Sequence, residues 1–280
     1  MTLTKILEPA KRGGYAVIAP DFLSINMLKH YLAVAEKYST PIIASYPPLP
    51  IDRFRRFNHW TYKLRALCDA ASIPVCLHLD HGKNPQTCIK AIKAGFTSVM
   101  IDASVFDLKQ NIEMTRQVVQ AARKVGISVE AEIGHVGSNM RGIEGPTDTG
   151  FLTDPNQAGC FVEHTDVDAL AVSIGTQHGH YKGTPDIDFK RLEDIRSFVN
   201  IPLVLHGGSG TGEENIRRTV ENGIHKINVF TDIIKPYLQA TASGFNPFSG
   251  KGIRMSQREV VDIILKKYFI ISGSLGKAVG

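Results

Sequence analysis

The stretch His78-Leu79-Asp80-His81-Gly82 sets polar residues directly after the apolar run Ile73-Pro74-Val75-Cys76-Leu77. The apolar run is typical of a buried parallel strand. An ionised carboxylate buried without a partner is costly, so an aspartate and a histidine are poor material for a core. The same two residue types suit a metal site, where histidine binds the ion and aspartate moves protons. The stretch therefore predicts a metal-dependent site at the end of a strand.

Two more histidines stand beside glycines at the ends of predicted strands. His178 lies in Gly175-Thr176-Gln177-His178-Gly179, and His206 opens His206-Gly207-Gly208-Ser209-Gly210. Three histidines on separate strand ends offer three nitrogen ligands and leave a metal position open for water or substrate. The alternative is that each one is a hydrogen-bonded structural histidine. The flanking glycines favour the metal site, since large side chains would obstruct a ligand.

Length and composition fit one domain without a membrane span. The chain has 280 residues with 43% hydrophobic and 21% charged, and an α/β barrel needs about 250 residues. We expect one domain over residues 1–280, ending in a helical extension. No apolar run reaches the roughly 18 residues of a membrane span, and the first residues lack a signal-peptide core. The four cysteines show no paired spacing, which indicates a reducing cytoplasm rather than a disulfide framework.

The net charge of +5 is spread along the chain. Its densest basic stretch is Arg53-Phe54-Arg55-Arg56-Phe57, followed by His59 and Trp60. Nucleic-acid binding would need basic residues gathered on one element. We therefore expect no nucleic-acid partner, and we interpret the stretch as a solvated helix face or as a basic rim for an anionic substrate.

Short apolar runs alternate with helical patterns, which predicts stacked βα units and a parallel sheet. We expect eight strands, near residues 15–19, 41–45, 73–80, 98–102, 127–132, 169–173, 203–205 and 226–229. Helices are expected to follow Ser24 and to occupy 85–94, 108–124, 155–164, 188–198, 213–221, 233–242 and 258–268. The Gly-rich span 134–153 breaks this rhythm and is typical of a functional loop. The pattern predicts a single-domain (β/α)₈ barrel, a TIM barrel.

Polar and ionisable residues that could take part in catalysis stand where the predicted strands end. In barrels of this kind the active site is built at the C-terminal ends of the strands. The residues are Asp80, His81, Asp102, Glu132, Thr176, His178, His206 and Asn228. A phosphate site is predicted at the same face. The run 206–212 leads into a helix N-terminus, and the segment 228–231 after the eighth strand offers more donors.

These motifs resemble the class II, zinc-dependent ketose-bisphosphate aldolases, in particular the fructose- and tagatose-bisphosphate branch. The resemblance runs from about Lys11 to the C-terminus. It is carried by the stretches 78–82, 130–134, 153–155, 175–183, 206–212 and 226–229. The resemblance implies a carbon–carbon lyase, an aldehyde-lyase of carbohydrate metabolism. Such an enzyme cleaves a ketose 1,6-bisphosphate or related ketose phosphate to dihydroxyacetone phosphate and an aldehyde, through a zinc-stabilised enediolate.

The resemblance also implies roles for individual residues. His81, His178 and His206 would hold Zn²⁺, and Asp80 would carry the proton at the aldehyde oxygen. A second divalent or a monovalent cation would bind at Asp102 and Glu132. The triose phosphate would contact Gly179, Gly207, Ser209, Asn228 and Thr231. No Schiff-base lysine is required, in keeping with strands that offer no obviously buried lysine.

Two further expectations concern the long loop and the assembly. Family members use a loop glutamate for proton transfer at the triose carbon, and Glu144 is the candidate here, although its spacing differs from Gly-Gly-x-Glu-Asp. A solvated loop glutamate is the alternative. Relatives are dimers or tetramers, so a homodimer or homotetramer without a membrane partner is expected. The apolar face Val260, Val261, Ile264 and Leu265 would serve that interface or pack on its own barrel.

The sequence departs from the family pattern near the expected substrate. Ala19-Pro20-Asp21 replaces the usual Ala-Phe-Asn, and Ser45-Tyr46-Pro47-Pro48 replaces a Ser-x-Gly turn. An aspartate adds negative charge near an anionic substrate, and we expect Tyr46 and the prolines to narrow or reshape the wall of the substrate site. An altered substrate is favoured over an inactive enzyme because Asp80 and the histidines are intact. A zinc barrel hydrolase is disfavoured, because Tyr15–Asp21 lacks a His-x-His pair. A non-catalytic or substrate-diverged sugar-phosphate-binding barrel stays open.

Overall fold

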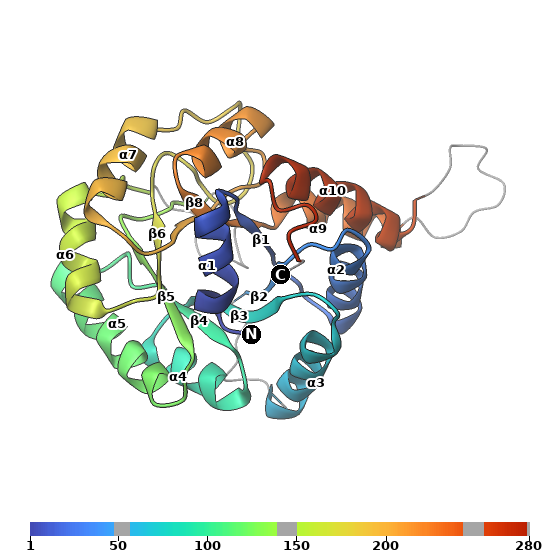
Figure 1. Cartoon of the computed structure of the whole chain (residues 1–280), viewed down its shortest axis with the longest axis horizontal. Coiled ribbons are helices and arrows are strands. Elements are labelled where there is room, and N and C mark those ends of the chain that lie inside the picture. The colour runs from blue at the N-terminus through green and yellow to red at the C-terminus, as the bar shows by residue number, and fades with distance from the viewer. Residues whose placement is uncertain (48–56, 139–149, 243–254, 279–280) are drawn as a thin grey trace.

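Eight parallel strands form a closed barrel in which each strand pairs with its neighbours along the chain and β8 pairs with β1. The computed structural model describes residues 1–47, 57–138, 150–242 and 255–278. Figure 1 shows helices surrounding the barrel on its outside. The predicted single-domain (β/α)₈ barrel is confirmed.

The strands lie within a few residues of their predicted positions, and most of their residues are buried. They are β1 (Val17–Pro20), β2 (Ile42–Tyr46), β3 (Val75–Gly82), β4 (Ser98–Ile101), β5 (Ser128–Ile133), β6 (Ala169–Val172), β7 (Leu203–Leu205) and β8 (Ile224–Val229). Helices cover them from outside, so both faces of every strand are shielded from water. The long apolar runs of the sequence follow from this arrangement.

The helices begin and end largely where the sequence signals indicate. They are α1 (Leu3–Gly13), α2 (Ile25–Lys37), α3 (Phe57–Ala70), α4 (Pro85–Ala94), α5 (Leu108–Arg123), α6 (Pro155–Thr165), α7 (Phe189–Phe198), α8 (Glu213–Glu221), α9 (Thr231–Ala242) and α10 (Gln257–Ile271). Ser24 caps α2 through the N–H of Met27, as predicted. Gly95 ends α4 with a φ of 105°, a conformation that favours glycine.

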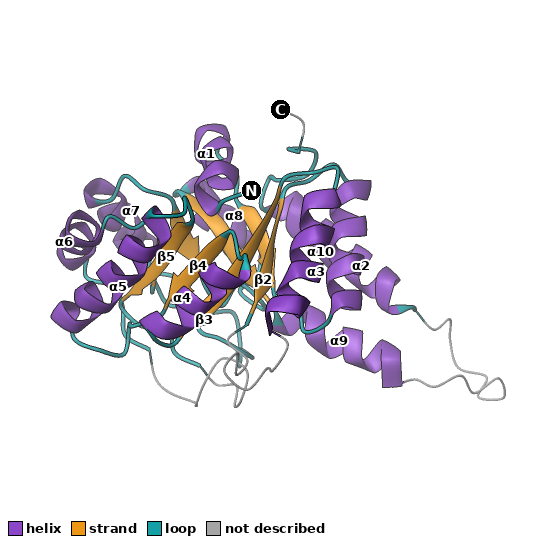
Figure 2. Ribbon diagram, turned by 90° about the horizontal axis from the view of Figure 1, so that it is seen from below, coloured by secondary structure: helices purple, strands orange, loops and turns teal. Residues whose placement is uncertain are grey.

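Helix α1 was not predicted, and α3 was anticipated only by one interpretation of the basic stretch as a solvated helix face, in which Phe57 is in fact buried. Helix α1 lies across one end of the barrel, and the loops that follow the strands gather at the other end (Figure 2). Its buried residues Leu3, Ile6 and Leu7 pack inside the barrel against residues such as Val17 and Cys76, near the strand starts. The sequence does carry local signals for this helix: Thr2 caps its start, Gly14 ends it with a φ of 63°, and its buried residues share one apolar face.

The C-terminal helix α10 packs against α9 and α2 of its own chain. Val260, Val261 and Leu265 are buried by this packing. Of the two expectations for this apolar face, packing on its own barrel is confirmed. No helix within the described ranges combines the length and the apolar character needed to cross a bilayer. All four cysteines are free thiols.

Candidate active site

Three histidine rings meet at the ends of three strands. His81 comes from β3, His178 follows β6, and His206 follows β7 directly. The ring centroid of His81 lies 4.8 Å from that of His178 and 4.6 Å from that of His206. One ligand nitrogen from each of the three rings lies within 4.8 Å of the others. The predicted convergence of the three histidines on one point is therefore present.

The backbone at His81 explains how Asp80 and His81 both face the barrel interior. Successive residues of a regular strand point to opposite faces. His81 instead has a φ of 43°, in the left-handed region. The pairing of β3 with β4 shifts its register between Leu79 and Gly82. This irregularity turns the His81 ring to the same side as the Asp80 carboxylate, with His81 Nε2 3.7 Å from Asp80 Oδ2.

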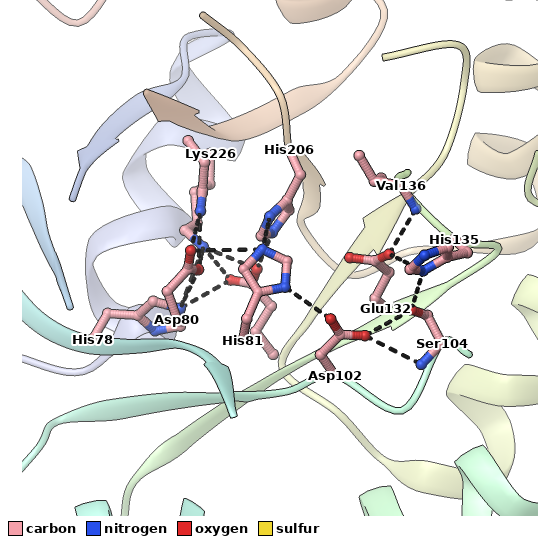
Figure 3. A network of polar contacts seen from close by, with 12 residues as sticks. His78, Asp80, His81, Asp102, Ser104, Glu132, His135, Val136, His206 and Lys226 are labelled. Atoms are coloured by element: carbon pink, nitrogen blue, oxygen red, sulfur yellow. Dashed lines mark hydrogen bonds and ion pairs between the residues drawn. The ribbon is translucent and has the colours of Figure 1, made fainter. Parts of the chain in front are cut away.

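A carboxylate holds the outer nitrogen of two of these rings. His81 Nδ1 lies 2.9 Å from Asp102 Oδ2 (Figure 3), and His206 Nε2 lies 3.0 Å from Glu130 Oε1. Each ring then turns its remaining nitrogen inward, and His206 Nδ1 lies 2.9 Å from His81 Nε2. Such facing nitrogens need either a hydrogen or a shared cation between them. Histidines held by carboxylates in this way are typical of metal sites, so the residues fit a divalent cation.

The electrostatics of these two rings differ. Burial disfavours protonation of His81, but Asp80 and Asp102 more than offset it and hold the pKa of His81 well above its usual value. Burial and the neighbouring positive charge of His81 hold the pKa of His206 well below its usual value. His81 is therefore the donor and His206 the acceptor in the contact between them. A cation bound by both nitrogens must displace that proton.

Asp80 lies beside the histidines and is held by an amide. Asn228 Nδ2 donates to both carboxylate oxygens, at 2.9 and 3.0 Å. Burial alone would raise the pKa of Asp80, but the positive charges of His81 and Lys226 and the hydrogen bonds from Asn228 hold it below its usual value. Asp80 is therefore an ionised carboxylate that can accept a proton.

Asp102 and Glu132 form a second acidic group with His81, with ligand atoms within 4.8 Å of one another. Burial and the Asp102 charge raise the pKa of Glu132 to about 8. Glu132 Oε1 accepts from the N–H of Val136, whereas Oε2 is buried without a hydrogen-bond partner among the described residues. Ser104 Oγ donates to Asp102 Oδ1 at 2.6 Å and fixes that carboxylate. The group suits a cation, as predicted for these two acids.

The five residues expected to contact a phosphate line one pocket next to the histidines. They are Gly179, Gly207, Ser209, Asn228 and Thr231, and the same pocket is lined by His178 and Asp21. Gly207 has a φ of 68°, and a Cβ there would lie 2.4 Å from the carbonyl oxygen of Gln177. Glycine is therefore required at this position.

Hydrogen bonds tie the two loops of the pocket together. Ser209 Oγ accepts from the N–H groups of Phe230 and Asp232, at 3.1 and 3.2 Å. Asp232 Oδ2 in turn accepts from the N–H of Gly210 and from the hydroxyl of Tyr268 on α10, the latter at 2.7 Å. The C-terminal helix thus braces the pocket from outside the barrel.

The expectation that the strands hold no buried lysine was wrong. Lys226 is fully buried in β8, and its Nζ donates to both carboxylate oxygens of Glu130 in β5, at 2.9 and 2.7 Å. His78 also joins this network, with Nε2 3.3 Å from Lys226 Nζ. A signal for these buried residues was available in the sequence, because residues two positions apart in a strand point to the same face. Each of them stands two positions before a predicted site residue: Lys226 before Asn228, Glu130 before Glu132, and His78 before Asp80.

The expectation that Tyr46 shapes the wall of the substrate site was also wrong. Its ring lies 4.6 Å from that of Trp60 and 5.6 Å from that of Phe22, in the cluster between barrel and helices. Tyr46 points outward because the inward position of β2 belongs to Ser45, which bridges to Asp21. Asp21 does line the pocket, as expected. Glu144 lies outside the described residues, as do Arg53 and Pro48.

The chain was compared with protein families and with proteins of known name. The model of the family described as "Fructose-bisphosphate aldolase class-II" matches residues 1–277. The chain is 36% identical over 285 residues to the 6-phospho-5-dehydro-2-deoxy-D-gluconate aldolase of Bacillus velezensis, covering 100% of this chain and 97% of the relative. The enzyme of the same name from Bacillus subtilis is 35% identical over 284 residues, covering 99% and 97%.

A solved structure has the same fold over nearly its whole length. The crystal structure of the YdjI aldolase from Escherichia coli K12 superimposes with a TM-score of 0.84 at 31% sequence identity. The match covers 99% of this chain and 100% of the other chain.

Proposed function

The chain belongs to the class II fructose-bisphosphate aldolase family and is therefore a carbon–carbon lyase, and we propose that it cleaves a phosphorylated ketose to dihydroxyacetone phosphate and an aldehyde. One observation carries the proposal. The rings of His81, His178 and His206 converge beside an ionised Asp80, at the mouth that also holds the anion pocket. Charge stabilisation, proton transfer and phosphate binding are thereby brought within reach of one small substrate.

Members of this family are metal-dependent, and the proposed cation is Zn²⁺ held by His81, His178 and His206. When bound, the ion supplies positive charge that stabilises the negative charge developing on the ketose oxygens. Asp102 aligns His81 from one side and Glu130 aligns His206 from the other. Asp102 and Glu132 are proposed to take a second divalent or a monovalent cation.

Asp80 is proposed as the group that moves the proton. In the cleavage direction its carboxylate takes the proton from the hydroxyl whose carbon becomes the aldehyde, and the adjacent carbon–carbon bond then breaks. The lowered pKa keeps Asp80 ionised, as a proton acceptor must be, and Asn228 keeps both carboxylate oxygens in place. We further propose Glu144 for the proton at the triose carbon.

The phosphate of the triose is proposed to bind at Gly179, Gly207, Ser209, Asn228 and Thr231. Backbone N–H groups at glycine-rich turns and the start of α9 favour an anion. Asp21, where the family has asparagine, lines the same pocket and disfavours a second negative group nearby. Together with the names of the Bacillus relatives, Asp21 supports a substrate that differs from fructose and tagatose bisphosphate. A non-catalytic role is not retained, because the ionised Asp80 and the histidines are intact.

The test is a screen of phosphorylated ketoses with metal-replete protein. Candidates are fructose 1,6-bisphosphate, tagatose 1,6-bisphosphate and 6-phospho-5-dehydro-2-deoxy-D-gluconate, with release of dihydroxyacetone phosphate as the readout. The matched control is Asp80→Ala loaded with the same metal. We expect release from at least one substrate with the wild type and a large loss with the variant. Equal rates for the two proteins would refute the mechanism.

The proposal extends to the state of the protein in the cell. A cytoplasmic homodimer or homotetramer without nucleic-acid or membrane partners is proposed. Light scattering on the purified chain measures the oligomeric state. A monomer at micromolar concentration would contradict this part and leave the proposed chemistry untouched.

A further inference from the structure

A buried ion pair crosses the barrel interior below the three histidines. Glu130 comes from β5 and Lys226 from β8, strands that are not neighbours in the barrel. Both residues are fully buried, and the lysine donates to both carboxylate oxygens. In Figure 3 Lys226 reaches from its strand toward Asp80, His78 and the neighbourhood of His206.

Stability alone does not account for this pair. Removing two charges from water costs about as much as their attraction returns, and apolar pairs of similar volume are often as stable or more so. Most of the interior near the strand starts is apolar, so such a replacement has a precedent within the same barrel. A role through neighbouring groups is the remaining explanation.

The pair acts on His206 through one hydrogen bond. Glu130 Oε1 accepts from His206 Nε2 at 3.0 Å. A ring that donates from Nε2 carries its lone pair on Nδ1. His206 Nδ1 is the nitrogen that faces His81, 2.9 Å from His81 Nε2. The acceptor therefore decides both the orientation of the ring and the nitrogen presented to a cation.

The ammonium group also occupies a second cluster. His78, Asp80 and Glu130 have ligand atoms close enough to hold a metal. Lys226 Nζ lies 3.3 Å from His78 Nε2, 2.7 Å from Glu130 Oε2 and 4.0 Å from Asp80 Oδ1. A positive charge that belongs to the chain thus stands among these groups, where it repels a divalent cation.

We infer that Glu130 and Lys226 are positioning residues, which act through His206 and direct the metal to one of two adjacent clusters. Glu130 fixes His206 with Nδ1 toward the cation, and Lys226 balances the Glu130 charge and excludes a metal from His78, Asp80 and Glu130. The inference rests on the proposed function, since it assumes that the three converging histidines bind the metal.

Two matched double variants isolate the hydrogen bond to His206. Glu130→Leu/Lys226→Met and Glu130→Gln/Lys226→Met both remove the two charges, but only the second keeps an acceptor for His206. Co²⁺ affinity is measured by chelator competition, together with the visible absorption spectrum of bound Co²⁺. The leucine variant should bind Co²⁺ about 10- to 100-fold more weakly than the glutamine variant, with an altered spectrum. Equal affinities and spectra would overturn the role of Glu130.

A single variant tests the second cluster. Lys226→Met should bind one more Co²⁺ per chain than the wild type, because His78, Asp80 and Glu130 lose their ammonium. Lys235→Met, an exposed lysine of α9, makes the same change of side chain and should leave the stoichiometry unchanged. An unchanged stoichiometry in Lys226→Met would overturn the exclusion role.

These outcomes remain separable from failure of the proposed function. His81→Ala must weaken Co²⁺ binding if the three histidines form the site, and the ketose screen is read independently through triose release. Thermal unfolding of each metal-free variant identifies any that does not fold. If the leucine double variant does not fold, the glutamine double variant, which keeps an acceptor and leaves no buried charge unpaired, is compared with the wild type and should bind Co²⁺ within a few-fold of it. A loss as large as in His81→Ala would overturn the role of Glu130 as an acceptor.

Discussion

The two ends of the barrel interior differ in chemistry although the same strands build both. Where the strands begin, the interior is largely apolar and is covered by α1. Two residues further along a strand the inward side chain becomes polar or ionisable, as from Cys76 to His78 in β3 and from Val204 to His206 across the end of β7. The strand starts thus provide stability and the strand ends carry chemistry, a division typical of such barrels.

The largest expected effect follows from removing a histidine at the polar end. His206→Ala should lower the rate of triose release by about 10³-fold or more, because a proposed ligand is lost. Its metal-free form should still fold, so that the loss of rate is measured per folded molecule. Steady-state rates and thermal unfolding check this prediction together. A variant that lost its stability but kept its rate per folded molecule would reverse the roles assigned to the two ends.

The matching change at the apolar end should give the opposite pattern. Leu7 is fully buried in α1, and Leu7→Ala should lower the free energy of unfolding by about 2–5 kcal/mol. The rate per folded molecule should remain that of the wild type. Urea denaturation of the metal-free chain measures the first quantity, and assays well below the midpoint measure the second. A large fall in rate at unchanged stability would contradict the division.

A smaller effect concerns acid stability. His225 lies near the start of β8, and burial together with Arg196 and Lys11 lowers its pKa to about 4. In the unfolded state the histidine pKa is about 6.5. Between pH 6.5 and pH 4 the unfolded state therefore binds more protons than the folded state, and the free energy of unfolding falls as the pH is lowered through this range. His225→Gln should therefore lose fewer degrees of Tm than the wild type between pH 7 and pH 4.5. Identical losses would show that His225 does not contribute.

The smallest effect is expected where α10 braces the anion pocket. Tyr268→Phe removes the hydroxyl that donates to Asp232 Oδ2. KM for a phosphorylated ketose should rise about fivefold, the factor for roughly 1 kcal/mol, with kcat nearly unchanged. A change confined to kcat would indicate that Tyr268 acts on the reacting centre rather than on phosphate binding.

Sequence patterns predicted the polar end better than the apolar end. Histidines beside glycines at strand ends identified His81, His178 and His206, since parallel strands of a barrel end at one mouth. Helix α1 was missed although Thr2 and Gly14 mark its ends, because the prediction followed the alternation of strands and helices, which begins only after this helix. The Glu130–Lys226 pair was missed because its partners are 96 residues apart, and only the closed barrel brings them together.

The orientation of His81 could not be predicted from the sequence. Adjacent Asp80 and His81 in a regular strand would point to opposite faces. Only the positive φ of His81 and the shifted pairing with β4 bring both into the interior. The sequence pattern therefore identified the residues without the backbone geometry that makes them neighbours.

That irregularity has a consequence for protein engineering. A left-handed conformation costs a non-glycine residue about 1–2 kcal/mol, and idealised barrels are built without such positions. Grafting these histidines and Asp80 onto a regular scaffold would send one of the two adjacent side chains outward, into the surrounding helices. A designer who wants this centre in another barrel must therefore transplant the distorted end of β3 along with the side chains.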